Sequence, residues 1–195
     1  PCDLPASYCE EHRLTVVPLY VSMASAAPVC FPAETFDTKA FYDSLREHTP
    51  VKTAAPSIDD YKKYMLPHLQ EGKEILYAGF SAKLSAAFNV ARLAAEDLME
   101  AFPERKIMCL NTKCASLGQG LLVTLLVDKR ETGSSLEETY AYGEQMVPRI
   151  RHWFTVADLM HLKRGGRISS STAIIGTMLQ IKPILRVNDE GGLEP

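Results

Sequence analysis

Short apolar runs alternate with longer segments of helical periodicity through most of this chain, and this alternation constrains its fold more than any other feature. The short runs are rich in Val, Ile, Leu and Tyr, which is typical of buried strands. The longer segments repeat apolar residues every three or four positions, which predicts amphipathic helices. Strands that alternate with helices favour a parallel sheet covered by helices, so we expect an α/β fold.

The expected elements follow one another along residues 14–149. A capping-box pattern at Ser57 marks the start of one helix, and Pro103 marks the end of another. The predicted strands are Leu14–Val21, Glu74–Phe80 and Lys106–Leu110. The predicted helices are Phe36–Leu45, Ser57–Leu69, a long helix entered directly from the second strand with apolar positions from Leu84 to Phe102, Leu117–Val127 and Ser135–Arg149.

The composition of the sequence changes near Pro148, where the basic stretch PRIRHW begins. We therefore expect an N-terminal α/β domain over residues 1–148 and the opening portion of a second α/β domain over residues 149–195. The turn Asn188–Gly192 has little chain left to pair with, so we expect the rest of this incomplete domain to lie outside the sequence. The elements predicted in the second part are a strand at His152–Val156, a short segment at Asp158–Leu162, a helix near Thr172–Ile181 and a strand at Pro183–Val187.

Composition and charge exclude several classes of protein. Of the 195 residues, 46% are hydrophobic and 23% are charged, which is ordinary for a globular protein and excludes a disordered chain. The 21 basic and 24 acidic residues give a net charge of −3, so we expect no nucleic-acid partner. The longest apolar run, Leu121–Val127, is too short to cross a bilayer, so we expect no stable membrane insertion.

Five cysteines are an odd number in a chain that is long enough to fold without disulfides, which favours reduced thiols in a cytoplasm. Cys109 and Cys114 are the closest pair, but no histidine lies near them in the sequence, so we predict no metal site. Cys109 falls within an apolar strand pattern and is expected to behave as a small buried hydrophobe.

We find no arrangement of residues that predicts independent catalysis. The sequence lacks a phosphate-binding P-loop, a metalloprotease helix and a serine-hydrolase elbow. Gly118 and Gly120 supply only part of a dinucleotide-binding fingerprint, because the third glycine is missing. The five histidines are scattered, and none lies in a recognisable triad context. We therefore predict no enzyme activity, no catalytic residue and no cofactor.

Three segments carry polar side chains where an anion could bind. Ser81 and Ser85 lie where a strand passes into a helix, and they either complete an anion site with the helix N-terminus or simply cap the helix. Thr53 precedes a proline and a helix cap, and is either a ligand or an ordinary loop residue. In the loop Lys163–Ser171, two glycines allow a positive φ beside Arg167, which either grips a carboxylate or faces solvent.

These segments, together with others, resemble the DegV family of bacterial fatty-acid-binding proteins. The matching segments occur in the same order as in the family and extend through nearly the whole chain. A single match would be weak evidence for the family, but six matches in register are strong evidence. The closest match is LKRGGRIS followed by GTMLQIKPIL. The further matches are PCDLP, VVPLYV, KTAAPS, FSAKLSAAFNVA and NTKCASLGQG.

The resemblance implies a two-domain, DegV-like α/β protein that encloses a long-chain fatty acid between its domains. It also implies a carrier in lipid metabolism that presents the carboxylate to a separate fatty acid kinase subunit, which makes the acyl phosphate. The family's head-group hydroxyls map onto Thr53 and Ser81, with Ser85 nearby, and its GGR arginine maps onto Arg167 near the head group. Ala82 stands where the family has a second serine, so we expect presentation to be weakened more than binding.

Two other functions fit the residues. The first is a phosphotransferase subunit that binds a small phosphorylated metabolite through Arg164, Arg167 and helix N-termini, with a nucleophilic His or Cys within reach. Phosphorylation of His152 or His161 would favour this function. The second is a regulatory interaction module whose basic stretch, Arg149–Arg167, docks on an acidic partner. The charge of the whole chain argues against nucleic acid as that partner.

Overall fold

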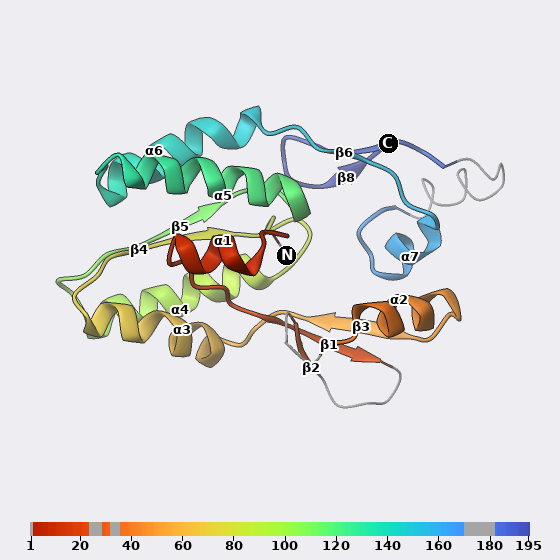
Figure 1. The fold of residues 1–195 in the computed structure, drawn as a ribbon, viewed down its shortest axis with the longest axis horizontal. Coiled ribbons are helices and arrows are strands. Elements are labelled where there is room, and N and C mark those ends of the chain that lie inside the picture. The colour runs from red at the N-terminus through yellow and green to blue at the C-terminus, as the bar shows by residue number, and fades with distance from the viewer. Residues whose placement is uncertain (1, 24–28, 32–35, 170–181) are drawn as a thin grey trace.

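The computed structural model describes residues 2–23, 29–31, 36–169 and 182–195, and it shows a mixed α/β fold built around a parallel strand pair (Figure 1). β4 (Ile75–Gly79) and β5 (Ile107–Asn111) form this pair, in register from Ile75 opposite Ile107 to Gly79 opposite Asn111. Helices lie on both faces of the pair. The predicted α/β class is confirmed.

One face of the strand pair is covered by α3 (Ile58–Gln70) and α4 (Ala87–Ala101). The predicted capping box starts α3, because Ser57 Oγ accepts from the Asp60 N–H and the Asp60 carboxylate accepts from the Ser57 N–H. The buried residues of this layer are Tyr61, Met65, Leu69, Ala91, Ala94, Ala95, Leu98 and Ile107. Four small or aliphatic positions of α4 therefore form its inward face, as the periodicity predicted.

The other face is covered by α5 (Ser116–Glu131) and α6 (Leu136–Met146), with a 3₁₀ turn, Val147–Arg149, after α6. Gly143 lets α6 approach closely, because a Cβ there would lie 2.6 Å from Leu110 Cδ2 and 2.9 Å from Leu126 Cδ2. The buried residues of this layer are Leu110, Cys114, Leu122, Leu126 and Ile150.

Two three-stranded antiparallel sheets flank this centre. In the first, β1 pairs with both β2 and β3. In the second, β7 pairs with β6 and β8, and α7 packs beside it with Leu159, Ile168 and Leu185 buried between them. The bounds are α1 (Ala6–Glu11), β1 (Leu19–Met23), β2 (Val29–Phe31), α2 (Thr38–Arg46), β3 (Val51–Ala54), β6 (Trp153–Phe154), α7 (Leu159–Arg164), β7 (Leu185–Val187) and β8 (Leu193–Glu194).

The structure corrects the first predicted strand, Leu14–Val21. Pairing begins at Leu19, after Pro18, which has no N–H to give to a ladder. The apolar residues before it are partly buried without being a strand: Val17 packs against the cluster formed by α3 and α4. The strand that does form is antiparallel to its neighbours, whereas the alternation of elements predicted parallel pairing.

The long helix predicted to follow β4 directly is also corrected, because α4 begins only at Ala87. The carbonyl of Ser81 accepts from the N–H groups of Leu84 and Ser85, which closes a single separate turn. Ser85 Oγ then accepts from the Ala87 N–H as α4 starts. Ser81 therefore does not cap a long helix, and Ser85 lies just before one.

At the other end of the chain, the turn after β7 does find a partner. Leu193–Glu194 returns antiparallel to β7, so the prediction that little chain is left to pair was wrong. The helix predicted near Thr172–Ile181 lies outside the described residues. None of the helices in the described ranges is long and apolar enough to cross a membrane.

Candidate functional site

A cavity of about 2460 Å³ lies in the described part of the protein. Small-molecule pockets commonly measure about 300–1,000 Å³, so this cavity has room for a long ligand. Its wall is predominantly apolar and is drawn from α1, α2, β3, α3, β4, α5 and the segment 150–167. Sequence-distant parts of the chain therefore share one lining.

Thr53 lies in this wall, on the edge strand β3. It is opposite Val21 of β1 in the antiparallel register, and its side chain is exposed. The strand thus holds the hydroxyl at a fixed place beside the cavity. That Thr53 contacts a ligand stays a prediction.

Arg167 lies in the same wall, directly after α7. Gly166 has φ +73°, and the N–H groups of Gly166 and Arg167 donate to the carbonyls of Lys163 and Leu162. This is a Schellman ending, which requires a residue that tolerates positive φ. The predicted positive φ in the Gly-Gly pair is confirmed, and it sets the position of Arg167.

Within the described ranges, the hydrogen bonds of the Arg167 guanidinium go to backbone carbonyls. Its Nε donates to the Leu84 carbonyl at 3.1 Å, and its Nη1 donates to the Gly165 carbonyl. Among the residues that the structure describes, no carboxylate pairs with it. Since Ser85 follows Leu84 and also lines the cavity, a full positive charge and a hydroxyl lie at the same part of the wall.

Ser81 is placed differently from the other predicted site residues. It is fully buried and is not among the residues that line the cavity. Its Oγ donates to the Gly191 carbonyl at 2.8 Å, and its N–H donates to the Cys114 carbonyl. In this structure its hydroxyl therefore joins the turn between β7 and β8 to the loop after β4.

Gly118 and Gly120, which gave a partial dinucleotide fingerprint, have another purpose here. A Cβ on Gly118 would lie 1.8 Å from His152 Nε2, and a Cβ on Gly120 would lie 2.3 Å from the carbonyl oxygen of Cys2. Because Gly118 and Gly120 have no side chain, His152 and the N-terminal residue Cys2 can pack closely against α5. Close packing, not phosphate binding, accounts for both.

Sequence reasoning missed Gln119, which lies between these two glycines. It is 6% exposed, lines the cavity, and its Nε2 donates to the Ala78 carbonyl of β4 at 3.1 Å. Its Oε1 is buried, and it has no hydrogen-bond partner within the described residues. A polar residue between two glycines was the only available signal.

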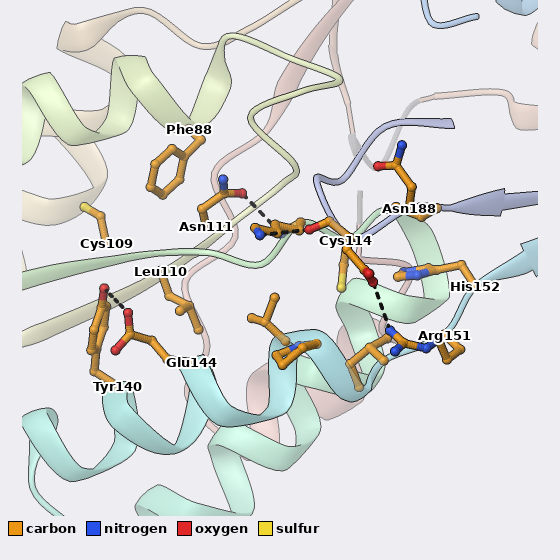
Figure 2. A pocket seen from close by; sticks show the side chains of 16 residues that line it. Phe88, Cys109, Leu110, Asn111, Cys114, Tyr140, Glu144, Arg151, His152 and Asn188 are labelled. Atoms are coloured by element: carbon orange, nitrogen blue, oxygen red, sulfur yellow. Dashed lines mark hydrogen bonds and ion pairs between the residues drawn. The ribbon is translucent and has the colours of Figure 1, made fainter. Parts of the chain in front are cut away.

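A second pocket, of about 450 Å³, lies at the carboxyl end of β5 (Figure 2). Two of its lining residues, Arg151 and Asp189, form an ion pair at 3.5 Å. Figure 2 shows the hydrogen bond from the Tyr140 hydroxyl to Glu144. His152, half-buried, belongs to the walls of both pockets. No group of three or more potential metal ligands occurs in the described ranges.

The fold and the cavity together define a class: mixed α/β proteins with a large, predominantly apolar cavity and a cationic, hydroxyl-bearing section in its wall. The chain belongs to the DegV family, whose profile, described as "Uncharacterised protein, DegV family", matches residues 1–195. The resemblance noted in the sequence is thereby confirmed.

Similar proteins come from several bacteria. A DegV domain-containing protein of Clostridium perfringens is 37% identical over 191 residues, which cover 98% of this chain and 66% of that protein. A DegV family protein of Thermus thermophilus, described as fatty acid binding, superposes with a TM-score of 0.86 at 35% identity, covering 99% of this chain and 66% of that one. A stearic acid-binding protein of Eubacterium ventriosum gives a TM-score of 0.90 at 26% identity, covering 98% and 66%. The chain thus spans about two thirds of these relatives' lengths.

Proposed function

We propose that this protein binds a long-chain fatty acid in the large cavity and presents its carboxylate to a separate fatty acid kinase, without catalysing a reaction itself. The observation that carries the proposal is the Arg167 charge, which has no carboxylate partner among the described residues and lies at an apolar cavity. The similarity to DegV proteins described as fatty acid binding supports it.

We assign the head-group contacts to Thr53, Ser85 and Arg167, which all line the cavity. Ser81 takes a positioning role in this proposal. Its hydroxyl donates a hydrogen bond to the Gly191 carbonyl and so helps to hold the loop between β4 and α4, which also carries Ser85. An arginine and two hydroxyls suit a carboxylate, since charge-assisted hydrogen bonds are stronger than neutral ones. We further propose a cytoplasmic protein, consistent with free thiols at Cys2, Cys9, Cys109 and Cys114.

The binding free energies expected for the acyl chain and for the carboxylate give the two ends of the ligand different roles. A sixteen-carbon chain buries ~14 methylenes at about 0.8 kcal/mol each, or on the order of 11 kcal/mol before ordering costs. Each hydrogen bond to the carboxylate contributes roughly 1.5–3 kcal/mol. The tail therefore determines affinity, while the head-group residues determine which end a kinase meets.

Lipid extraction and mass spectrometry of the purified full-length protein test the proposal. We expect one class of long-chain fatty acid to co-purify in about equimolar amount. Protein without any acyl chain, and unable to take up added palmitate or stearate, would contradict it. A phosphorylated His152 or His161 would instead favour the phosphotransferase alternative, which no observation in the structure favours at present.

The kinase step has its own test. Thr53→Val removes the hydroxyl and keeps the shape of the side chain. We expect it to reduce acyl phosphate formation with a fatty acid kinase by more than it reduces fatty acid affinity. Equal losses in both measurements would contradict the assigned division between head and tail.

A further inference from the structure

The edge of β4 that faces away from β5 is open. Among the residues that the structure describes, β4 pairs with β5 and with no other strand (Figure 1). Four consecutive residues of β4, Ile75–Ala78, line the large cavity. Successive side chains of a strand point to opposite faces of the sheet, so a cavity that reaches all of them runs along the edge of the strand. The large cavity therefore borders an open sheet edge.

The hydrogen bonds of β4 show which of its backbone groups point along this edge. The Ile75 N–H donates to the Lys106 carbonyl, so Ile75 and every second residue after it face β5. In a parallel pair the residues between them, Leu76 and Ala78, direct their N–H and C=O groups the other way. The Ala78 carbonyl accordingly accepts from the Gln119 side chain. No described strand receives the other groups, which are the N–H and C=O of Leu76 and the N–H of Ala78.

A second segment with free backbone groups faces the same cavity. Leu14–Val17 is neither helical nor part of a sheet, and all of its residues line the cavity. Within the described ranges, its backbone hydrogen bond is the one from the Leu14 N–H to the Cys9 carbonyl. Val17 packs against the same core cluster as Ile75 of β4, so both segments border one layer of the core. Backbone groups away from water are nearly always hydrogen-bonded, so the two segments point to a strand that pairs with both.

The start of the described chain lies beside the carboxyl end of the open edge. A Cβ on Gly120 would lie 2.3 Å from the Cys2 carbonyl oxygen, which places Cys2 against α5. The preceding residue of α5, Gln119, donates to Ala78 near the carboxyl end of β4. Polypeptide that enters Cys2 after running along the open edge is therefore parallel to β4.

We propose that the open edge of β4 binds a third parallel strand, formed by the segment of the full-length protein that leads into Cys2. This strand pairs with Leu76 and Ala78 on one side and with Leu14–Val17 on the other. Helices cover both faces of the strand pair, so the added strand is apolar on both faces. A strand of about five residues, the usual length, matches β4. About a third of the length of each relative described above lies outside the match, so those proteins contain further polypeptide.

The inference goes beyond the proposed function and does not rest on it. The added strand narrows the cavity along β4, so the space for a ligand in the full-length protein is smaller than 2460 Å³. Thr53 and Arg167 belong to other parts of the wall, on β3 and after α7. Fatty acid binding can therefore be present whether or not the open edge binds a strand.

Amide hydrogen exchange of the full-length protein, resolved residue by residue, tests the proposal. We expect the amides of Leu76 and Ala78 to exchange at least about a hundredfold more slowly than in an unstructured chain, as should that of Tyr77, which faces β5. The amides of the residues that lead into Cys2 should be protected as well. Rapid exchange at Leu76 and Ala78 would overturn the proposal.

Two other outcomes would overturn the assigned occupant. The first is protection of Leu76 and Ala78 together with rapid exchange in the residues that lead into Cys2. The second is protection that appears only as the protein concentration rises, because the edge would then pair with a second copy of the chain.

Leu76→Pro tests the outward N–H directly. Within a sheet, proline is confined to places where no ladder hydrogen bond is needed, such as an edge strand whose N–H faces solvent. Leu76→Ala is the matched control, because it also loses the leucine side chain but keeps the N–H. With the third strand in place, we expect Leu76→Pro to unfold at least about 4 °C below Leu76→Ala. Equal unfolding temperatures would show that this N–H needs no partner and would overturn the proposal. The exchange measurement requires no variant, so it decides the question if Leu76→Pro does not fold.

Discussion

Cys109 and Cys114 lie on opposite sides of the central strand pair. Cys109 packs against the α3–α4 layer, and Cys114 is buried in the α5–α6 layer. Burial raises the pKa of each thiol to about 11, because an apolar surrounding disfavours the thiolate. The sequence-based view of Cys109 as a small hydrophobe agrees with this environment.

The two thiols should therefore resist alkylation. At pH 8 we expect iodoacetamide to modify neither Cys109 nor Cys114 in the folded protein, since the thiolate is the reactive form. Both should react within minutes once the protein is unfolded in urea. Peptide mass spectrometry measures the two rates, and equal labelling in native and unfolded protein would contradict the burial described here.

His152 carries a pH dependence. Burial lowers its pKa in the folded state below the ordinary value of about 6.5, so the unfolded chain binds the proton more readily. Folding therefore favours the neutral imidazole. The contribution of His152 to the free energy of unfolding is fully present above about pH 6.5, and it is lost as the pH falls below that value and the imidazole of the unfolded chain takes up a proton.

This can be measured as a difference between two proteins. Urea unfolding at pH 7.5 and pH 5.5 should show a smaller loss of stability on acidification for His152→Phe than for the wild type. Other titrating groups contribute equally to both and cancel. An identical loss in the two proteins would show that His152 titrates alike in the folded and unfolded states.

At the scale of the element, the helices with local signals were the most predictable. Ser57 with Asp60, and Ser135 with Glu138, lie three residues apart and form reciprocal capping boxes. The partner in each case is encoded nearby, so the sequence contains the whole interaction. Asp60 also accepts from the Tyr20 hydroxyl, and these hydrogen bonds lower the pKa of its carboxyl.

Removing a cap should cost stability. Ser135→Ala deletes the hydroxyl that accepts from the Glu138 N–H, and we expect the free energy of unfolding to fall by about 1 kcal/mol. Ser134→Ala is the control, because that exposed hydroxyl shares a hydrogen bond with its near neighbour Thr132 and caps no helix among the described elements, and we expect a change within about 0.5 kcal/mol. Urea unfolding followed by circular dichroism measures both, and equal effects would argue against the cap.

Elements whose partners are remote were predicted less well. Ser81 looked like a helix cap because a strand and a helical pattern met there, but its hydrogen-bond partner is Gly191, 110 residues away. Gln119 gave no recognisable motif, since its significance comes from the Ala78 carbonyl and the cavity. Thr53 and Arg167 stood out as candidates within their own segments, but only the family resemblance predicted that they act at one site, because neither periodicity nor spacing placed them together.

At the scale of the whole molecule, the turn between β7 and β8 fastens the late part of the chain to the early part. Gly191 has φ +87°, and a Cβ there would lie 2.3 Å from Ser81 Oγ and 3.1 Å from the Cα of Lys113. Lys113 also donates to the Asp189 carbonyl. The attachment therefore depends on a residue without a side chain.

Gly191→Ala should loosen this attachment. We expect a loss of about 1–3 kcal/mol of stability from overpacking, beyond the strain of a positive φ, and faster tryptic cleavage after Arg151. Gly133→Ala is the matched control: its φ is +84°, but nothing lies within 4 Å of the added Cβ. Thermal unfolding and limited proteolysis compare the two, and indistinguishable variants would show that the close approach to Ser81 carries no energy.

The bond from Ser81 to Gly191 also has a consequence for biosynthesis. A ribosome makes the chain from its N-terminus, so Ser81 is synthesised long before Gly191, whose carbonyl accepts the hydrogen bond from the Ser81 hydroxyl. During that interval the Ser81 hydroxyl can accept from the Lys83 N–H of its own loop, but it has no Gly191 carbonyl to which it can donate. A chain interrupted before Gly191 therefore lacks this attachment between its late and early parts.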